Sequence, residues 1–165
     1  MKTQNKKGFS IVEILVYLAI FTALSILVIN SFITILSSFD ITNMNRKLLE
    51  SGTISMERIS REIRQAESVN AITTSTALVL NSHDNLESDM VIKFINEDGK
   101  LNFYKNDNLE GNLLGQNISV TNLIFSRITT AKSEAVRIIM TLQYSGENNI
   151  KSENFYDTII LRGGY

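Results

Sequence analysis

The stretch "KKGFSIVEILVYLAIF", residues 6–21, decides the fold of the N-terminal part of the chain. It sets two lysines and a glycine before an apolar run, and the run contains one carboxylate, Glu13. From Ile14 to Phe39 there are 26 residues without Asp, Glu, Lys, Arg or His. A helix of that length measures about 39 Å, whereas the hydrocarbon core of a bilayer is about 30 Å thick. We therefore expect residues 9–39 to form a transmembrane helix.

The charges on either side of the apolar run predict its orientation. Lys2, Lys6 and Lys7 precede Gly8, and Asp40 is the first charged residue after the run. Because basic residues stay on the cytoplasmic side, the N-terminus is predicted inside and the remainder outside. The run exceeds the roughly 7 to 15 apolar residues of a secretory signal peptide, so we expect it to remain in the mature protein.

The composition limits the kind of protein that follows the helix. The 165 residues include no Cys and one His, and the formal net charge is -1. The absence of Cys excludes disulfides and thiolate metal sites. The near-neutral charge disfavours a basic nucleic-acid surface. One set of arginines, Arg58, Arg61 and Arg64, could suggest DNA binding, but the interleaved Glu57, Glu62 and Glu67 cancel its charge. We expect one small head that folds on its own hydrophobic core.

Glu13 needs an explanation, because an ionised carboxylate within an apolar segment is costly and usually has a partner. One interpretation places it at the headgroup level, where it reaches water without any special role. The other interpretation depends on its neighbours. A basic leader ending in "KKG" is followed by Phe9, Ser10, two apolar residues, Glu13 and the apolar run. This arrangement resembles the type IV filament superfamily, which comprises type IV pilins, the pseudopilins of type II secretion and competence pseudopili.

The resemblance implies a processing reaction. In that family a prepilin peptidase would cut between Gly8 and Phe9 on the cytoplasmic side and methylate the new amino group of Phe9. Residues 1–8, including Lys6 and Lys7, would then be a cytoplasmic leader peptide. Neither a catalytic residue nor a cofactor of this chain's own is implied.

The resemblance also supplies a partner for Glu13, which would be the fifth residue of the mature chain. The new amine at Phe9 would be largely cationic at neutral pH. Glu13 lies four residues later, about 6 Å along the helix axis and on the same face. In the family this carboxylate would neutralise the amine of a neighbouring subunit during assembly, and pairing within one chain stays open.

Three further features bear on the subtype. The chain has no Pro, whereas major pilins often carry a helix-kinking proline in the apolar half, so a minor pilin or pseudopilin is favoured. The stretch "MERISREIRQAESV", residues 56–69, resembles the end of the stem helix in minor pilins and in J-type minor pseudopilins. The ending "FYDTIILRGGY", residues 155–165, resembles the C-terminal strand of minor pilins, with Arg162 at the position of their arginine.

Residues 40–69 are predicted to continue the helix as an amphipathic stem, so that one helix runs from about Phe9 to about Ala66. Apolar or small residues recur at steps of three or four: Ile41, Met44, Leu48, Gly52, Met56, Ile59, Ile63 and Ala66. Three exposed pairs are spaced four residues apart: Arg46 with Glu50, Glu57 with Arg61, and Arg58 with Glu62. Gly52 marks a bend or a close contact, or is an ordinary tolerated glycine.

Residues 70–165 are predicted to form a β-rich head, because the hydrophobic period changes from 3.6 to 2. Five or six strands are expected, from the segments "TALVLN" (76–81), "MVIKFI" (90–95), "KLNFYK" (100–105), "ISVTNLIF" (118–125), "AVRIIMTLQY" (135–144) and "DTIILR" (157–162). Asp98-Gly99 is a strong hairpin signal. A small antiparallel sheet packed against residues 54–69 gives an α+β fold.

The polar stretches of the head contain weak candidates for sites. His83 lies in "NSHDNLESD", residues 81–89, which is predicted to be a surface loop, so a hydrolase based on this histidine is remote. Oxygen ligands for calcium are available at Asp84, Asn85, Glu87 and Asp89, but their spacing matches no defined calcium loop. "NDNLEGN" (106–112) is a second predicted loop, and Asn117 begins a glycosylation sequon. No metal site is predicted.

The sequence therefore favours a structural subunit: a minor pilin or pseudopilin of a type IV pilus or of a secretion or competence pseudopilus. The expected partners are prepilin peptidase, other pilin or pseudopilin subunits through the N-terminal helix, an inner-membrane assembly platform and membrane lipid. The expected location is the cytoplasmic membrane, followed by a periplasmic or extracellular filament. The alternative is a binding module, an adhesin or sensor head, on a single membrane anchor that never assembles.

Overall fold

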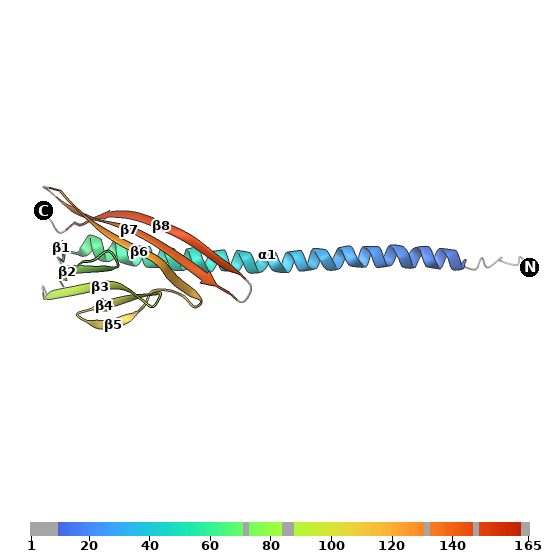
Figure 1. Ribbon diagram of the computed structural model, residues 1–165, viewed down its shortest axis with the longest axis horizontal. Coiled ribbons are helices and arrows are strands. Elements are labelled where there is room, and N and C mark those ends of the chain that lie inside the picture. The colour runs from blue at the N-terminus through green and yellow to red at the C-terminus, as the bar shows by residue number, and fades with distance from the viewer. Residues whose placement is uncertain (1–9, 71–72, 84–87, 131–132, 147–148, 163–165) are drawn as a thin grey trace, which may run out of the picture. The chain divides into compact units, whose positions relative to one another are not determined.

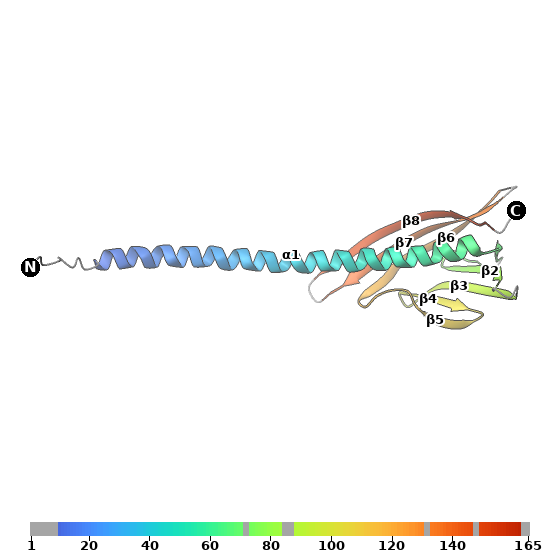
Figure 2. The same cartoon turned by 180° about the vertical axis from the view of Figure 1, so that it is seen from behind.

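The computed structural model describes residues 10–70, 73–83, 88–130, 133–146 and 149–162. These residues form one helix and eight strands, which confirms the α+β class (Figures 1 and 2). The elements are α1 (Ile11–Gln65), β1 (Ser68–Val69), β2 (Ala77–His83), β3 (Asp89–Glu97), β4 (Lys100–Lys105), β5 (Asn108–Asn112), β6 (Ile118–Thr129), β7 (Glu134–Ser145) and β8 (Ile150–Ile160). The chain divides into two compact units, residues 1–42 and 43–165.

The end of α1 is set by the start of the sheet. The Ala66 N–H donates to the Glu62 carbonyl at 2.9 Å and closes the last turn. The Glu67 N–H then donates to the Asn81 carbonyl of β2 at 2.9 Å. Residues 68 and 69, which the sequence placed in the stem, therefore pair with β2 as strand β1.

One face of α1 is buried within the second unit, as the three-and-four spacing predicted. The buried residues are Met44, Leu48, Gly52, Ser55, Met56, Ile59, Ser60, Glu62 and Ile63. Ile41, the first residue of the predicted stripe, is 46% exposed. Two of the predicted pairs form, Arg58 with Glu62 at 2.9 Å and Arg61 with Glu57 at 3.2 Å. The described residues show no such contact for the third pair, Arg46 with Glu50.

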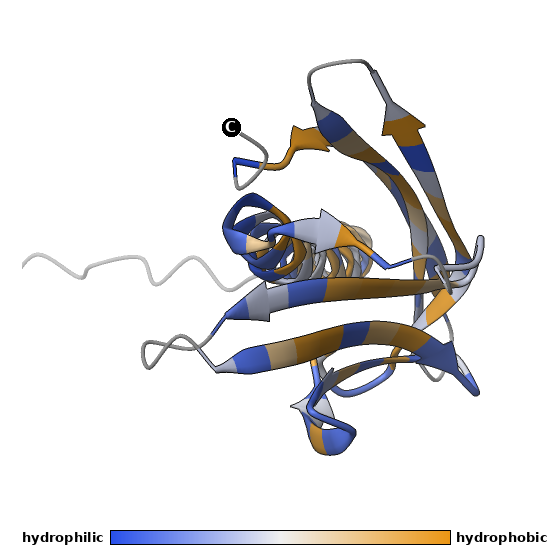
Figure 3. Ribbon diagram, turned by 90° about the vertical axis from the view of Figure 1, so that its left-hand side faces the viewer, coloured by the Kyte–Doolittle hydropathy of each residue, from blue (hydrophilic) through white to orange (hydrophobic). Residues whose placement is uncertain are grey.

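The strands form two antiparallel sheets, where the sequence predicted one. The first sheet has the order β1-β2-β3-β4-β5 and the second the order β6-β7-β8. Figure 3 looks along the helix and shows strands on two of its sides. Helix residues Leu48 and Ile63 belong to one hydrophobic cluster with Phe94 of the first sheet and Ile138 of the second. The stem face is therefore covered by both sheets.

The predicted hairpin at Asp98-Gly99 is confirmed. The two residues have φ angles of 50° and 75°, and Glu97 pairs with Lys100 on either side. Positive φ at both central positions is the geometry of a two-residue hairpin turn, and Gly adopts it without strain. The Gly99 carbonyl also accepts the Val120 N–H of β6 at 2.8 Å, so this turn connects the two sheets.

The predicted loop at residues 106–112 is wrong, because β5 lies within it. Asn106 and Asp107 have φ angles of 48° and 66° and form a second tight turn between β4 and β5. The Asn106 side-chain carbonyl accepts the Val91 N–H at 2.9 Å, which ties this turn to β3. Because β5 is mostly exposed and polar, it lacks the alternation that identifies a half-buried strand.

The last strand also differs from its prediction. It was predicted to span residues 157–162, but β8 begins at Ile150 and ends at Ile160. Most β8 side chains before Ile159 are polar or partly exposed, so the first two thirds of the strand carry no hydrophobic pattern. Pairing with β7 along its whole length holds β8 in the sheet.

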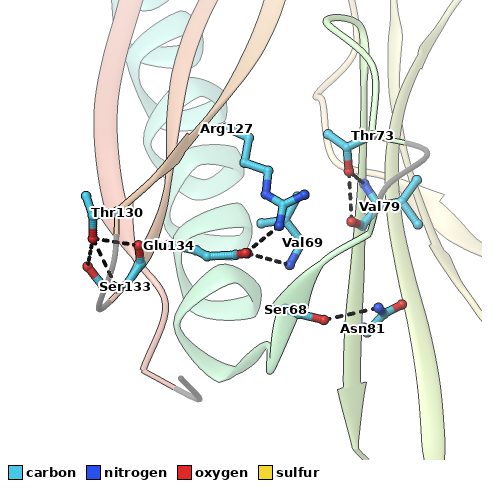
Figure 4. A network of polar contacts seen from close by, with 9 residues as sticks. All are labelled: Ser68, Val69, Thr73, Val79, Asn81, Arg127, Thr130, Ser133 and Glu134. Carbon is cyan, nitrogen blue, oxygen red and sulfur yellow. Dashed lines mark hydrogen bonds and ion pairs between the residues drawn. The ribbon is translucent and has the colours of Figure 1, made fainter. Parts of the chain in front are cut away.

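Glu134 connects β1 to the second sheet (Figure 4). Its carboxylate accepts hydrogen bonds from the Arg127 guanidinium and, at 3.2 Å, from the Val69 N–H. The bond from Arg127 is the main reason why the pKa of Glu134 lies below its ordinary value of 4.5; partial burial opposes this shift, and the Val69 N–H adds to it. The short strand that follows α1 is therefore held by a charge-assisted contact as well as by its sheet.

Candidate processing and assembly segment

The predicted cleavage and methylation residues, Gly8 and Phe9, lie outside the described residues, as do Lys6 and Lys7. Their roles stay predictions. The description begins at Ser10, whose carbonyl accepts the N–H of Glu13 at 3.0 Å and the N–H of Ile14 at 3.2 Å. These bonds form the first turn of α1 directly after the predicted cleavage site.

The first part of α1 is apolar on all sides. The apolar residues of this part of the helix are not buried within the chain. Among the described residues, α1 is the one helix that is long enough and apolar enough to cross a membrane, judged by length and composition. Large apolar residues such as Phe21, Val28 and Phe32 are more than half exposed. A surface of this kind requires lipid or other apolar helices as its surroundings.

Six hydroxyl side chains within and just after the apolar run bond to their own helix. Each donates to a backbone carbonyl three or four residues earlier at 2.8 to 2.9 Å: Thr22, Ser25, Thr34, Ser37, Ser38 and Thr42. These hydroxyls need no water as a partner, which reduces the cost of placing them in hydrocarbon. These six hydroxyls are thus compatible with a membrane span.

Glu13 has a hydrogen-bond partner in its own helix that the sequence analysis missed. The Tyr17 hydroxyl donates to Glu13 Oε1 at 3.1 Å. The two residues are four apart and therefore lie on the same face, a spacing from which the contact could have been predicted. Tyr17 was instead counted as one more residue of the apolar run.

His83 is at the surface, but it is not in a loop. It is the last residue of β2, and its side chain is 44% exposed. Its Nδ1 lies 3.5 Å from a Glu67 oxygen and its Nε2 lies 3.2 Å from an Asp89 oxygen. No serine or threonine hydroxyl bonds to this ring among the described residues, so the contacts are those of surface polar pairs.

The proposed calcium ligands are only partly described. Asp84, Asn85 and Glu87 lie outside the described residues, while Asp89 is the first residue of β3. Within the described ranges, no group of three or more His, Cys, Asp or Glu residues could hold a metal ion. Asn117, at the start of the sequon, has a φ angle of 62° and precedes β6.

Arg162, the residue that resembles the C-terminal arginine of minor pilins, lines a groove of about 660 Å³ in the second unit. The groove lies between the last turns of α1 and strand β8, and Arg61, Arg64, Tyr156 and Asp157 also line it. Ser60 lines it as well, and the Ser60 hydroxyl donates to Asp157 Oδ2 at 3.1 Å. Arg61 is paired with Glu57, four residues earlier on the same helix, at 3.2 Å.

Two comparisons with known proteins gave no match: neither a curated protein nor a solved structure resembles this chain at a significant level. The comparison with protein families gave one match, to the prokaryotic N-terminal methylation motif at residues 3–29. The matched residues include the predicted leader, the predicted cleavage bond, Glu13 and the first half of the apolar helix. The chain thus carries the N-terminal methylation motif that is characteristic of type IV pilin-like proteins.

Proposed function

We propose that this protein is a minor pilin or pseudopilin, a structural subunit that is assembled into a type IV pilus or into a secretion or competence pseudopilus. The observation that carries the proposal is the methylation motif at residues 3–29, which overlaps the start of a helix with an exposed apolar surface. The absence of proline and the resemblance of residues 56–69 favour a minor subunit, either a J-type minor pseudopilin or a related minor pilin.

Processing would prepare the chain for assembly. Prepilin peptidase would remove residues 1–8 by cutting between Gly8 and Phe9, and would methylate Phe9. The cut creates a cationic amine one helical turn before Glu13. An unpaired carboxylate or ammonium in the apolar phase is strongly unfavourable, so the two groups would pair as subunits meet. Such a pair fixes the register of neighbouring helices more than it adds stability.

The proposed division of the chain follows from this role. Residues 9–39 would lie first in the cytoplasmic membrane, with the N-terminus inside, and later in the filament core. Residues 40–69 would be the stem and residues 70–165 the head, outside the cytoplasm. The exposed apolar side chains of α1 would exchange lipid contacts for contacts with neighbouring subunits on the assembly platform. The hydroxyls bonded within the helix would keep their partners during this exchange.

Replacement of residues 9–39 by an unrelated transmembrane helix tests this proposal against a membrane-anchored binding module. The chimera keeps the membrane span and the head but loses the motif and the helix surface. We expect the chimera to insert into the membrane and to be absent from sheared filaments, whereas the wild-type chain co-purifies with them. A chimera that keeps full cellular function would favour the adhesin or sensor head. A wild-type chain that never enters filaments would overturn the proposal.

A further inference from the structure

We propose that Tyr17 is a positioning residue for Glu13: its hydroxyl holds one carboxylate oxygen and leaves the other free for the amine of a neighbouring subunit. This inference rests on the proposed function. The Tyr17 Oη atom lies 3.1 Å from Glu13 Oε1. No bond to Glu13 Oε2 is present among the described residues, so one side of the carboxylate is occupied and the other is open.

The helix geometry directs this contact. Side chains of an α-helix lean toward its N-terminus, so a residue covers the turn before its own Cα atom. Tyr17 therefore reaches back over one turn to Glu13, and Glu13 in turn leans toward the N-terminal end of the helix. The hydrogen bond thus holds the carboxylate from its C-terminal side and leaves its N-terminal side open.

The chemistry suits a charge in an apolar phase. A phenol hydroxyl donates one hydrogen bond, and a bond to an ionised acceptor is stronger than one between neutral groups. The Tyr17 side chain is mostly apolar and 56% exposed, so its ring can remain in lipid or against another helix while the hydroxyl contacts Glu13. A carboxylate fixed in one rotamer also loses less freedom when the amine docks. The benefit to assembly is therefore one of orientation.

Tyr17 could also anchor the helix at the membrane–water interface, and the experiment must separate this role from the positioning of Glu13. Tyr residues are common at the membrane–water interface, where the hydroxyl anchors a helix at the headgroup level. Leu18 is the next residue, is 58% exposed and lies about 1.5 Å deeper on a different side of the helix. The double substitution Tyr17→Phe/Leu18→Tyr keeps a hydroxyl at nearly the same depth but points it away from Glu13, since residues five apart do not share a face.

The experiment compares the wild-type chain, Tyr17→Phe and Tyr17→Phe/Leu18→Tyr, each expressed in full length in the source cells. The N-terminal mass of the membrane pool reports cleavage, and the amount in sheared filaments relative to that pool reports incorporation. We expect normal cleavage of all three chains and an incorporation about tenfold lower for both variants, the loss expected for one hydrogen bond to a charged group.

Each other result overturns the positioning role. Normal incorporation of Tyr17→Phe would show that the hydroxyl is dispensable, and recovery by the double variant would assign it to interfacial anchoring. A defect in cleavage would show that Tyr17 acts in the processing step, which precedes assembly. If the wild-type chain itself is neither cleaved nor incorporated, the proposed function fails, and this inference fails with it. If only the variants behave unexpectedly, the proposed function stands.

Discussion

Gly52 of α1 packs directly against the aromatic ring of Phe155 on β8. A methyl group added at Gly52 would lie 2.0 Å from Phe155 Cζ and 2.4 Å from Cε1. Of the explanations considered for this glycine, close packing is the one confirmed. The absence of a side chain lets the third strand of the second sheet approach the helix, because any Cβ atom would occupy the place of the ring.

Gly52→Ala should therefore destabilise the second unit, although Ala favours a helix over Gly by about 1 kcal/mol. We expect a net loss of about 1–3 kcal/mol in the free energy of unfolding, as in other overpacked cores. Chemical denaturation of the full chain in detergent measures this loss. Thr53→Ala, at the exposed neighbouring position, is the matched control and should change stability little. A Gly52→Ala variant as stable as the wild type would contradict the packing.

Gly99→Ala should destabilise the hairpin between β3 and β4. Gly99 has a φ angle of 75°, and a Cβ atom there would lie 3.2 Å from the Ser119 Cβ atom. We expect a loss of about 1–2 kcal/mol. Gly99→Asn provides the comparison, because Asn tolerates positive φ but meets the same neighbour. A smaller loss for Asn than for Ala assigns the effect to φ, and equal losses assign it to the contact with Ser119.

Glu134→Gln should reduce stability at neutral pH by about 1–2 kcal/mol, since it weakens the contacts with Arg127 and Val69. The folded-state pKa of Glu134 lies below its ordinary value of 4.5, so its contribution is complete above that pH and is lost as the pH falls through the folded-state pKa. Denaturation at several pH values should show a constant difference from pH 7 to about 5 and a shrinking one below about 4.5. A difference independent of pH would contradict the ionic role.

Glu13→Ala should leave cleavage intact and abolish incorporation into filaments, because the amine of the neighbouring subunit would lose its counter-charge. Glu50→Ala is the matched control: Glu50 is exposed on the stem and has no ion pair among the described residues. Mass spectrometry of the membrane pool and quantification of sheared filaments measure the two steps. Normal incorporation of Glu13→Ala would refute the pairing role, whereas the Glu50 variant should behave as the wild type.

The sequence predicted those parts of the fold that a local pattern of residues specifies, namely hydrophobic periodicity and turn residues. The buried stripe of α1, the hairpin at Asp98-Gly99 and the alternating strand β7 were predicted correctly. β5 was missed because Asn106 and Asp107 form a turn without a glycine and the strand is polar. The first part of β8 was missed because partly buried positions such as Lys151 and Glu153 carry charged residues, so the alternation in burial does not appear as an alternation in hydrophobicity. The division into two sheets depends on long-range pairing, which local periodicity does not encode.

For the candidate segment, the position of Glu13 in the motif was predictable, but its contact with Tyr17 was not predicted. A pattern of hydrophobicity treats Tyr17 as an apolar residue and ignores its hydroxyl. The spacing of four residues was present in the sequence, but the direction of the side chains had to be seen in the structure.

The central claim is that the bond between Gly8 and Phe9 is cut and the new amine is methylated before the protein works. Intact-mass and N-terminal peptide analysis of the protein from its source cells tests this claim most directly. We predict a chain that begins at N-methylated Phe9 in both membrane and filament fractions. A functional chain that retains residues 1–8 would contradict the account.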